Sequence, residues 1–212
     1  MNYFNRFALL FLSVVCCVVS MRAQAALDSQ VLDLIKGAKK QIGVTVTYNP
    51  AYKVIPYPNG DVPAKEGVCT DVIIRAFRDQ GIDLQKLIHE DIKANKSKYP
   101  NLWKLAKADP NIDHRRVPNL MVLLQSVASV VKKSDARPGD IVVWDVGGGR
   151  EVLHIGVLSD QMKGRVPFAI HNIGWGVKEE DVLNSYKIIT MYRFSSDAIQ
   201  KLKALDKKKA TA

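Results

Sequence analysis

The spacing of the apolar residues changes once along this 212-residue chain, and that change constrains the fold more than any other feature. Up to residue 127 the apolar residues recur at steps of three and four, which predicts helices over residues 29–41, 70–80, 83–97 and 118–127. From residue 137 they alternate, which predicts strands. These comprise a hairpin over residues 137–160, turned by three consecutive glycines, and strands at 166–174 and 185–194.

The order of these elements indicates the fold class. The helices precede the strands, and no strand–helix–strand alternation is visible in the sequence. This order is typical of an α+β fold, in which helices pack on one face of an antiparallel sheet. We therefore expect N-terminal helices lying on an antiparallel sheet built from the second half of the chain.

Residues 1–25 resemble a cleavable secretory signal peptide. Arg6 precedes the apolar run at residues 7–20, and the small-x-small sequence Ala23-Gln24-Ala25 provides a cleavage site. An uncleaved membrane anchor is the alternative, but the run is shorter than the roughly 20 apolar residues that a spanning helix needs. Lipidation at Cys16 or Cys17 is disfavoured because the apolar run continues past both. We expect a periplasmic or secreted protein with no stable membrane span after cleavage.

The remaining chain is expected to form one domain over residues 26–200, followed by a flexible basic tail over residues 201–212. Cys69 is its only cysteine, so no internal disulfide can form and the core must be hydrophobic. The formal charge of +10 is basic, and for an exported protein this favours anionic envelope polymers over nucleic acid as partners. We expect a monomer.

Cys69 stands at the expected start of a helix, where unpaired N–H groups and the helix dipole favour a thiolate. The alternative is that Cys69 is a small apolar filler of the core. A nucleophilic thiol also needs a base, usually a histidine, and the chain offers His89, His114, His154 and His171. His89 lies on an expected helix and His114 in a loop, and we expect both to be exposed to solvent.

His154 and His171 lie on expected strands. His154 shares one strand face with Val152 and Gly156, opposite the bulky apolar set of the same strand, which is typical of a residue lining a groove. On the following strand His171 and Asn172 are adjacent, so only one of them can point toward His154.

Three stretches together resemble the NlpC-type branch of papain-like cysteine peptidases, bacterial enzymes that cut cell-wall peptides. They are "PYPNGDVPAKEGVCTDVIIRAF" from residue 56, "RPGDIVVWDVGGGREVLHIGVLSD" from residue 137 and "FAIHNIGWG" from residue 168. The resemblance covers roughly residues 56–176. The chain is closer still to an uncharacterised exported subfamily of that clan, a domain family of unknown function that would include nearly the whole mature chain.

The resemblance implies a role for each matching residue. Cys69 would be the nucleophile, His154 the base and His171 the third polar residue, with Asn172 as the other candidate. Tyr57 would bind the oxyanion together with the backbone N–H of Cys69. The implied chemistry is acyl transfer through a thioester, which requires no metal and no other cofactor.

The sequence departs from the family pattern in two places. Where the family commonly has Asp-Cys-Ser-Gly, this chain has Val68-Cys69-Thr70-Asp71, which changes the substrate pocket, and residues 81–118 form a longer helical insertion. We expect Trp175, Asn172 and Asp71 to bind substrate, and Trp144 to lie in the core. Residues 113–116, "DHRR", are expected to form an exposed, salt-bridged loop, with binding of a carboxylate as the alternative.

The expected function is hydrolysis of an amide or peptide bond in bacterial cell-wall peptides by a Cys-His-polar triad. Two alternatives stay open. The chain could be a non-catalytic papain-like module that binds peptidoglycan or a partner protein, or a cysteine acyltransferase, since an amine can resolve a thioester as well as water can.

Overall fold

The computed structural model describes residues 28–208 except residues 105 and 149, so the expected signal peptide lies outside the described residues. The helices are α2 (Ser29–Lys39), α3 (Cys69–Arg78), α4 (Leu84–Asn95), α5 (Val117–Val127) and α6 (Ser196–Lys208). The strands are β1 (Thr47–Tyr48), β2 (Glu66–Gly67), β3 (Ser129–Val130), β4 (Ile141–Asp145), β5 (Leu153–Lys163), β6 (Val166–Asn172), β7 (Val177–Glu180) and β8 (Lys187–Arg193). Short 3-10 turns span Lys96–Lys98, Asp113–Arg115 and Lys133–Asp135.

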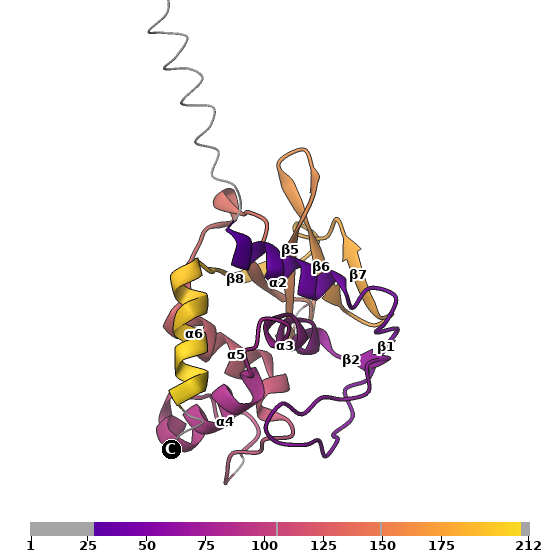
Figure 1. The fold of residues 1–212 in the computed structure, drawn as a ribbon. Helices are drawn as coiled ribbons and strands as arrows, with labels where there is room; N and C mark the ends of the chain where they lie inside the picture. Colours follow the sequence, from indigo (N-terminus) through magenta and orange to yellow (C-terminus); the bar gives the residue numbers. More distant parts are fainter. Residues whose placement is uncertain (1–27, 105, 149, 209–212) are drawn as a thin grey trace, which may run out of the picture.

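The main sheet has six strands in the order β3-β8-β4-β5-β6-β7, and every neighbouring pair is antiparallel. Helices α2 and α3 lie across one face of this sheet, while α4, α5 and α6 gather beyond α3 (Figure 1). The predicted α+β fold with helices on one face of an antiparallel sheet is therefore confirmed. Strands β1 and β2 form a separate parallel pair immediately before α3.

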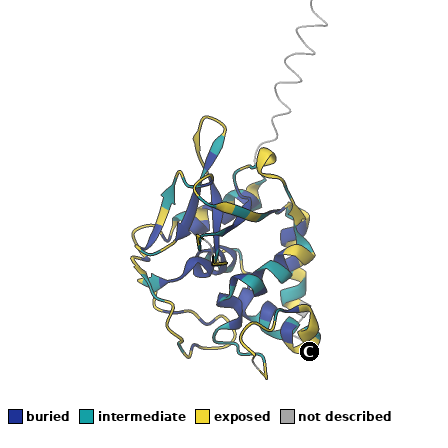
Figure 2. Cartoon of the chain, turned by 180° about the vertical axis from the view of Figure 1, so that it is seen from behind, coloured by how far each residue is buried: buried dark blue, intermediate teal, exposed yellow. Residues whose placement is uncertain are grey.

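The larger core lies between the helices and the sheet. Helix α3 contributes four fully buried apolar side chains, and the sheet contributes every second residue of its central strands (Figure 2). The members from α3 are Val72, Ile73, Ala76 and Phe77, and those from the sheet include Ile141, Val143, Ile155, Val157 and Ile170. This alternation is what a sheet with a core on this face requires.

The opposite face of the sheet carries a smaller core. It contains Val142, Trp144, Leu158, Ala169, Leu183 and Met191, and the segments around residues 131–136 and 182–188 pack on it. Trp144 is fully buried, so its predicted core position is confirmed. The central strands are thus buried on both faces, which allows polar side chains on either face to be shielded from water.

Helices α2 and α3 cross at very close range. A Cβ atom added to Gly37 of α2 would lie 2.9 Å from the Cα atom of Ala76 in α3, closer than real Cβ contacts allow. The two small residues therefore let the helix backbones touch. This contact holds α3, and with it Cys69, against the sheet.

The expectation of a flexible tail at residues 201–212 is wrong for residues 201–208, the part that the structure describes. Helix α6 continues to Lys208, and Ile199 and Leu202 are fully buried against the main core. Their spacing, continued by Leu205, gives the helix an apolar stripe that the many lysines between them obscure in the sequence. The domain therefore extends past residue 200.

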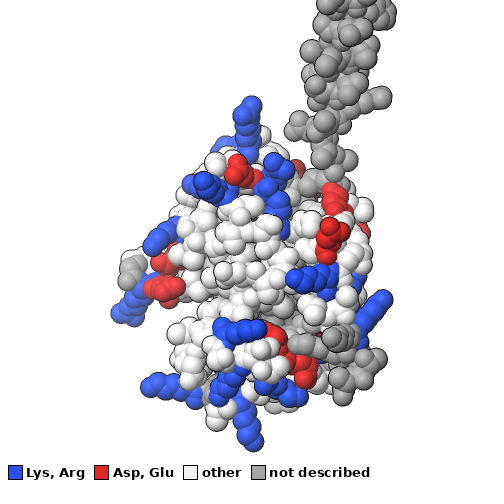
Figure 3. Space-filling view, turned by 90° about the vertical axis from the view of Figure 1, so that its left-hand side faces the viewer, with Lys and Arg blue, Asp and Glu red and all other residues white. Residues whose placement is uncertain are grey.

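On the face drawn in Figure 3, Lys and Arg side chains are spread over several elements, with acidic side chains between them. The positive excess of the sequence does not gather into one strip on this face. No helix in the described ranges is both long enough and apolar enough to cross a membrane.

Candidate active site

Cys69 is the first residue of α3, and its side chain is only 5% exposed. Burial raises the pKa of the thiol to about 11, although the backbone N–H of Ile155 donates to the sulfur and opposes the rise. The backbone N–H groups of Thr70 and Cys69 itself act in the same direction as that of Ile155. In this structure the thiol is therefore neutral at pH 7, with N–H groups already placed to stabilise a thiolate.

The sulfur lies where β5 and β6 separate. On this side the ladder between the two strands ends at the pair Val157–Ile170. The N–H of Leu158 points to Asp140 on the β4 side, and successive amides of a strand point to alternate sides, so the N–H of Ile155 points toward β6. Cys69 thus accepts a hydrogen bond that a continued β6 would have accepted. This places the sulfur beside the backbone of Ile155, the residue after His154 on β5.

Asn172 fixes the segment before Cys69 to the sheet. Its amide group donates to the carbonyl of Gly67 at 3.1 Å, and the side chain is fully buried. Asn172 lies on the helix-side face of β6, so it does not point toward His154. The structure gives Asn172 a contact that positions the start of α3.

The rings of His154 and His171 meet on the opposite face of the sheet, against Trp144. His154 Nε2 lies 2.8 Å from His171 Nδ1, and His171 Nε2 lies 3.2 Å from a carboxylate oxygen of Glu180 on β7. Trp144 stacks on His154 at 5.7 Å between ring centroids. Of the adjacent pair on β6, it is therefore His171 that faces His154.

Gly156 makes room for this pair of rings. A Cβ atom at this position would lie 3.1 Å from the Cβ of His171 and 3.2 Å from Trp144. Any larger residue would push on both His171 and Trp144. The glycine two residues after His154 on β5 is thus explained by the close packing of the His171 side chain from β6.

The hydrogen-bond chain assigns the protons on both rings. A carboxylate only accepts, so His171 must donate from Nε2 to Glu180, which leaves its Nδ1 as an acceptor. His154 then donates from Nε2 to His171, and its own Nδ1 carries the lone pair. That nitrogen has no hydrogen-bond partner among the described residues, and it is the ring nitrogen nearer to the backbone beside Cys69. His154 is therefore held in the tautomer whose Nδ1 can accept a proton.

Neither imidazole is charged in the resting structure. Burial lowers the pKa of His154 to about 3, with a smaller contribution from His171, and burial also lowers the pKa of His171 against the opposing effect of Glu180. In the described part of the chain no hydrogen bond joins the Cys69 thiol to His154. The resting pair is thus a neutral thiol and a neutral imidazole.

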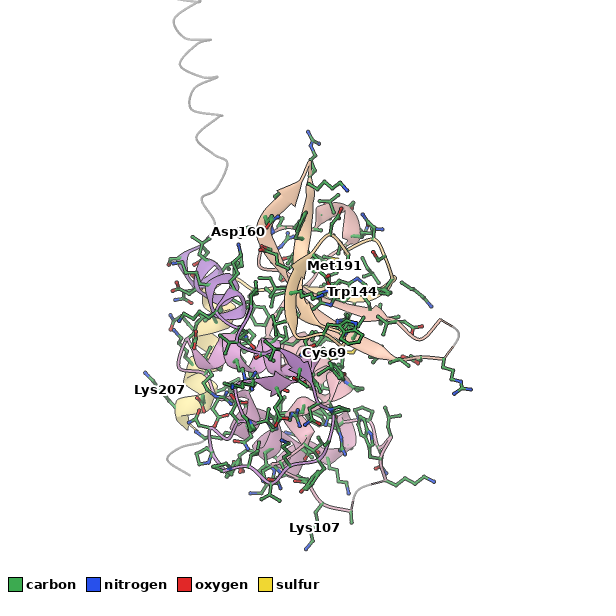
Figure 4. All side chains as sticks on the ribbon, turned by 90° about the vertical axis from the view of Figure 1, so that its right-hand side faces the viewer. Cys69, Lys107, Trp144, Asp160, Met191 and Lys207 are labelled. Carbon is green, nitrogen blue, oxygen red and sulfur yellow. The ribbon has the colours of Figure 1, made fainter. Side chains whose placement is uncertain are left out.

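A cleft of about 750 Å³ opens in front of Cys69. Tyr48 lines it, and the Tyr48 hydroxyl forms a hydrogen bond with the Cys69 side chain. Burial raises the pKa of this phenol to about 12, and the adjacent sulfur adds to the effect. Cys69 is therefore a buried thiol at the wall of a cleft and is not sealed inside hydrocarbon. Figure 4 shows it centrally, below Trp144, where the sheet meets the helices.

Tyr57, expected to bind the oxyanion, lies elsewhere. Its hydroxyl donates to Glu90 at 2.8 Å, and its ring contacts the edge of His89 at 5.1 Å between centroids. The tyrosine beside the sulfur is Tyr48. The parallel pairing of β1 with β2 brings Tyr48 next to Gly67 and so to the start of α3, a contact that no local sequence pattern marks.

Asp71, expected to bind substrate, makes a structural ion pair. It accepts two hydrogen bonds from Arg115, at 3.0 and 2.9 Å, and a third from the backbone N–H of Val68 at 2.6 Å. The side chains of Asp71 and Arg115 are 4% and 2% exposed. These contacts fix the start of α3 to the 3-10 turn at Asp113–Arg115. Trp175, the other aromatic or acidic residue expected to bind substrate, is 83% exposed.

The expected exposure of residues 113–116 is wrong. Asp113, His114 and Arg115 are all buried, because the 3-10 turn that carries them packs between α3, α4 and α5. His114 was expected in solvent, yet its side chain is buried and burial lowers its pKa to about 3. The predicted salt bridges do form, between Arg115 and Asp71 and between Arg116 and Asp113.

These buried histidines predict loss of stability in acid. The folded pKa of His154 lies below its ordinary value of 6.5, so its neutral form contributes stability above pH 6.5, and this contribution is lost as the pH falls toward 3. We expect the melting temperature of the protein to fall over that range in scanning fluorimetry. The fall should be smaller for His154→Gln, because glutamine does not titrate. Parallel curves for the two proteins would contradict a depressed pKa at His154.

The chain is similar to a curated protein, to a solved structure and to one family model. Over 168 residues it is 48% identical to the uncharacterized protein YijF of Escherichia coli (strain K12), covering 77% of this chain and 81% of that protein. Among solved structures it is similar to a protein described as similar to a lipoprotein of the NLP/P60 family, from Staphylococcus aureus. That similarity has a TM-score of 0.38 and 12% identity, and covers 78% of this chain and 41% of that protein. The family model described as domain of unknown function (DUF1287) matches residues 35–194, and the chain therefore belongs to the DUF1287 family.

Proposed function

We propose that this protein is an exported cysteine hydrolase that cleaves an amide or peptide bond in bacterial cell-wall peptides. The observation that carries the proposal is the position of the Cys69 sulfur. It lies at a helix N-terminus, in the wall of a cleft, and beside a strand whose His154 is held in the tautomer of a base. The cell-wall substrate is supported by the signal-like N-terminus and by the resemblance to NlpC-type peptidases.

In the proposed reaction, the sulfur attacks the carbonyl carbon of the scissile amide while His154 Nδ1 accepts the thiol proton. His154 then donates this proton to the leaving amine as the C–N bond breaks, and a thioester remains on Cys69. Water adds to the thioester with His154 again acting as the base, which releases the acid and restores the thiol. His171 and Glu180 act as positioning residues, because they fix the ring of His154 and its tautomer.

Two donors are available for the oxyanion that forms in each step. They are the backbone N–H of Cys69 at the helix start and the hydroxyl of Tyr48, which forms a hydrogen bond with the Cys69 side chain. We therefore assign to Tyr48 the role that the resemblance implied for Tyr57. Catalytic hydrogen bonds often tighten only when substrate binds, so the neutral, unbonded resting pair is compatible with this mechanism.

A non-catalytic binding module is the second candidate, and one observation favours it. The pKa of the Cys69 thiol is raised to about 11, whereas a nucleophilic cysteine usually has a lowered pKa. In that case the cleft would hold a cell-wall peptide without turnover. A cysteine acyltransferase would use the same groups as the hydrolase, with an amine in place of water.

Digestion of purified cell walls separates these candidates. The mature protein is incubated with cell walls, and released fragments are identified by mass spectrometry. We expect new amine and carboxylate ends with the wild type and none with Cys69→Ala. Tyr48→Phe should release fragments at least about tenfold more slowly, because it removes an oxyanion donor, while the matched variant Tyr57→Phe should match the wild type. Binding to cell walls without release by any variant would favour the module.

A further inference from the structure

A second cavity of about 430 Å³ adjoins the cleft of Cys69. All of its lining residues lie between Ile92 and Asn119, so it is built by the insertion together with the first turn of α5. The residues Pro100, Trp103 and Arg116 line both this cavity and the cleft. The two spaces therefore share a wall, and a bound molecule could extend from one into the other.

The shared wall is a stacked pair. The guanidinium carbon of Arg116 lies 4.0 Å from the centroid of the Trp103 ring, a cation–π contact. The Trp103 side chain is 41% exposed, so a ligand can reach the stack from the cleft. Arg116 is mostly buried, and its charge is consequently less screened than that of a surface arginine.

The charges around the second cavity favour an anion. Arg116, Lys96 and Lys107 line it, against one acidic residue, Asp113. Asp113 is already satisfied, because it accepts a hydrogen bond from the backbone N–H of Asp109 at 2.5 Å and one from Arg116 at 3.2 Å. Lys96 uses one of its three protons on the carbonyl of Ala106, which leaves two for a ligand. Lys107 lies at the outer end of this region of the molecule (Figure 4).

The rest of the lining is apolar or aromatic and includes Ile92, Tyr99 and Ala108. A space of this size with a few charged groups on an apolar wall suits a small organic ligand better than an inorganic ion. The matching chemistry is a carboxylate on a short aliphatic stem. An acidic amino-acid side chain within a peptide provides both parts.

We propose that this cavity is a second subsite, which binds a carboxylate-bearing residue of the peptide whose amide bond reaches Cys69. The position of the scissile bond rests on the proposed hydrolase function, but the binding of the carboxylate does not. The insertion at residues 81–118 thereby gives the protein a preference for acidic peptides.

The test uses the mature Cys69→Ala protein, so that binding is measured without turnover. Two probes that differ by one charge are titrated, acetyl-Ala-Glu-amide and acetyl-Ala-Gln-amide, and the indole N–H signal of Trp103 is followed by NMR. We expect a saturable shift of this signal and at least about fivefold tighter binding of the glutamate probe, a difference of about 1 kcal/mol. The indole signal of Trp175 should not move.

Two further variants locate the effect. Arg116→Gln and Lys107→Gln should each reduce the preference for the glutamate probe. Lys107 is exposed, so its variant still tests the subsite if Arg116→Gln disturbs folding through the lost ion pair with Asp113. Equal affinity for the two probes, a shift at Trp175 alone, or no saturable shift would each overturn the subsite. If the subsite is overturned but the wild type still releases cell-wall fragments, the hydrolase function stands. If the glutamate probe is preferred but no fragments are released, only the subsite stands.

Discussion

Replacing His154 with alanine is expected to lower the rate of fragment release from cell walls by at least about 10³-fold, because a positioned general base typically contributes 10²–10⁴-fold and His154 also protonates the leaving amine. The ring is buried against Trp144, so folding is checked by circular dichroism, and His154→Gln fills the space if alanine leaves a cavity. The measurement is the initial rate at equal protein concentration. Retention of more than a tenth of the activity by both variants would rule out His154 as the base.

Glu180→Gln is the graded control for this prediction. Glutamine keeps the shape of the side chain but can offer an N–H or an oxygen to His171, so it no longer enforces the tautomer that the carboxylate fixes. We expect a loss of about tenfold in rate, together with a change in the ¹⁵N shifts of the His154 ring. A loss in rate without any change in those shifts would mean that Glu180 acts in some other way.

Replacing Arg115 with methionine is expected to lower the free energy of unfolding by about 3–5 kcal/mol, because it leaves the buried carboxylate of Asp71 without its ionic partner. Methionine retains much of the length and the apolar stem of arginine, so the loss reports mainly on the charge. The free energy is measured by urea unfolding monitored by tryptophan fluorescence.

Lys163→Met is the matched control for the buried pair. Lys163 forms an ion pair with Asp181 at 2.8 Å, but the two side chains are 75% and 36% exposed. An exposed pair of this kind contributes about 0–1 kcal/mol, so the control should unfold almost as the wild type does. Similar losses for the two variants would show that burial does not strengthen the dependence of Asp71 on Arg115.

The sequence predicted the fold because its periodicity is strong where the core is made. The apolar residues of α3 and of the central strands repeat at the spacing that one buried face requires, and their elements formed as expected. The short strand β7 was missed, because Val177–Glu180 carries three charged residues in four positions. Its pairing with β6 outweighs its composition, and it brings Glu180 to His171.

The candidate site was predictable only in part, for a physical reason. Parity along β6 showed that just one of His171 and Asn172 could face His154, but selecting between them required the register of the sheet. Likewise, Tyr48 contacts Cys69, and Arg115 contacts Asp71, although the residues of each pair are distant in the sequence. No local pattern in the sequence marks such contacts.

The hairpin that joins β5 to β6 projects beyond the sheet, and its first residue, Asp160, lies well away from Cys69 (Figure 4). Its tip at residues 160–165 is exposed, while the ladder between the two strands is anchored at Val157 and Leu158. Extra residues at this tip would not displace the strand positions that hold His154 and His171. The tip is thus a natural place to insert a fluorescent reporter or an affinity peptide for following this protein.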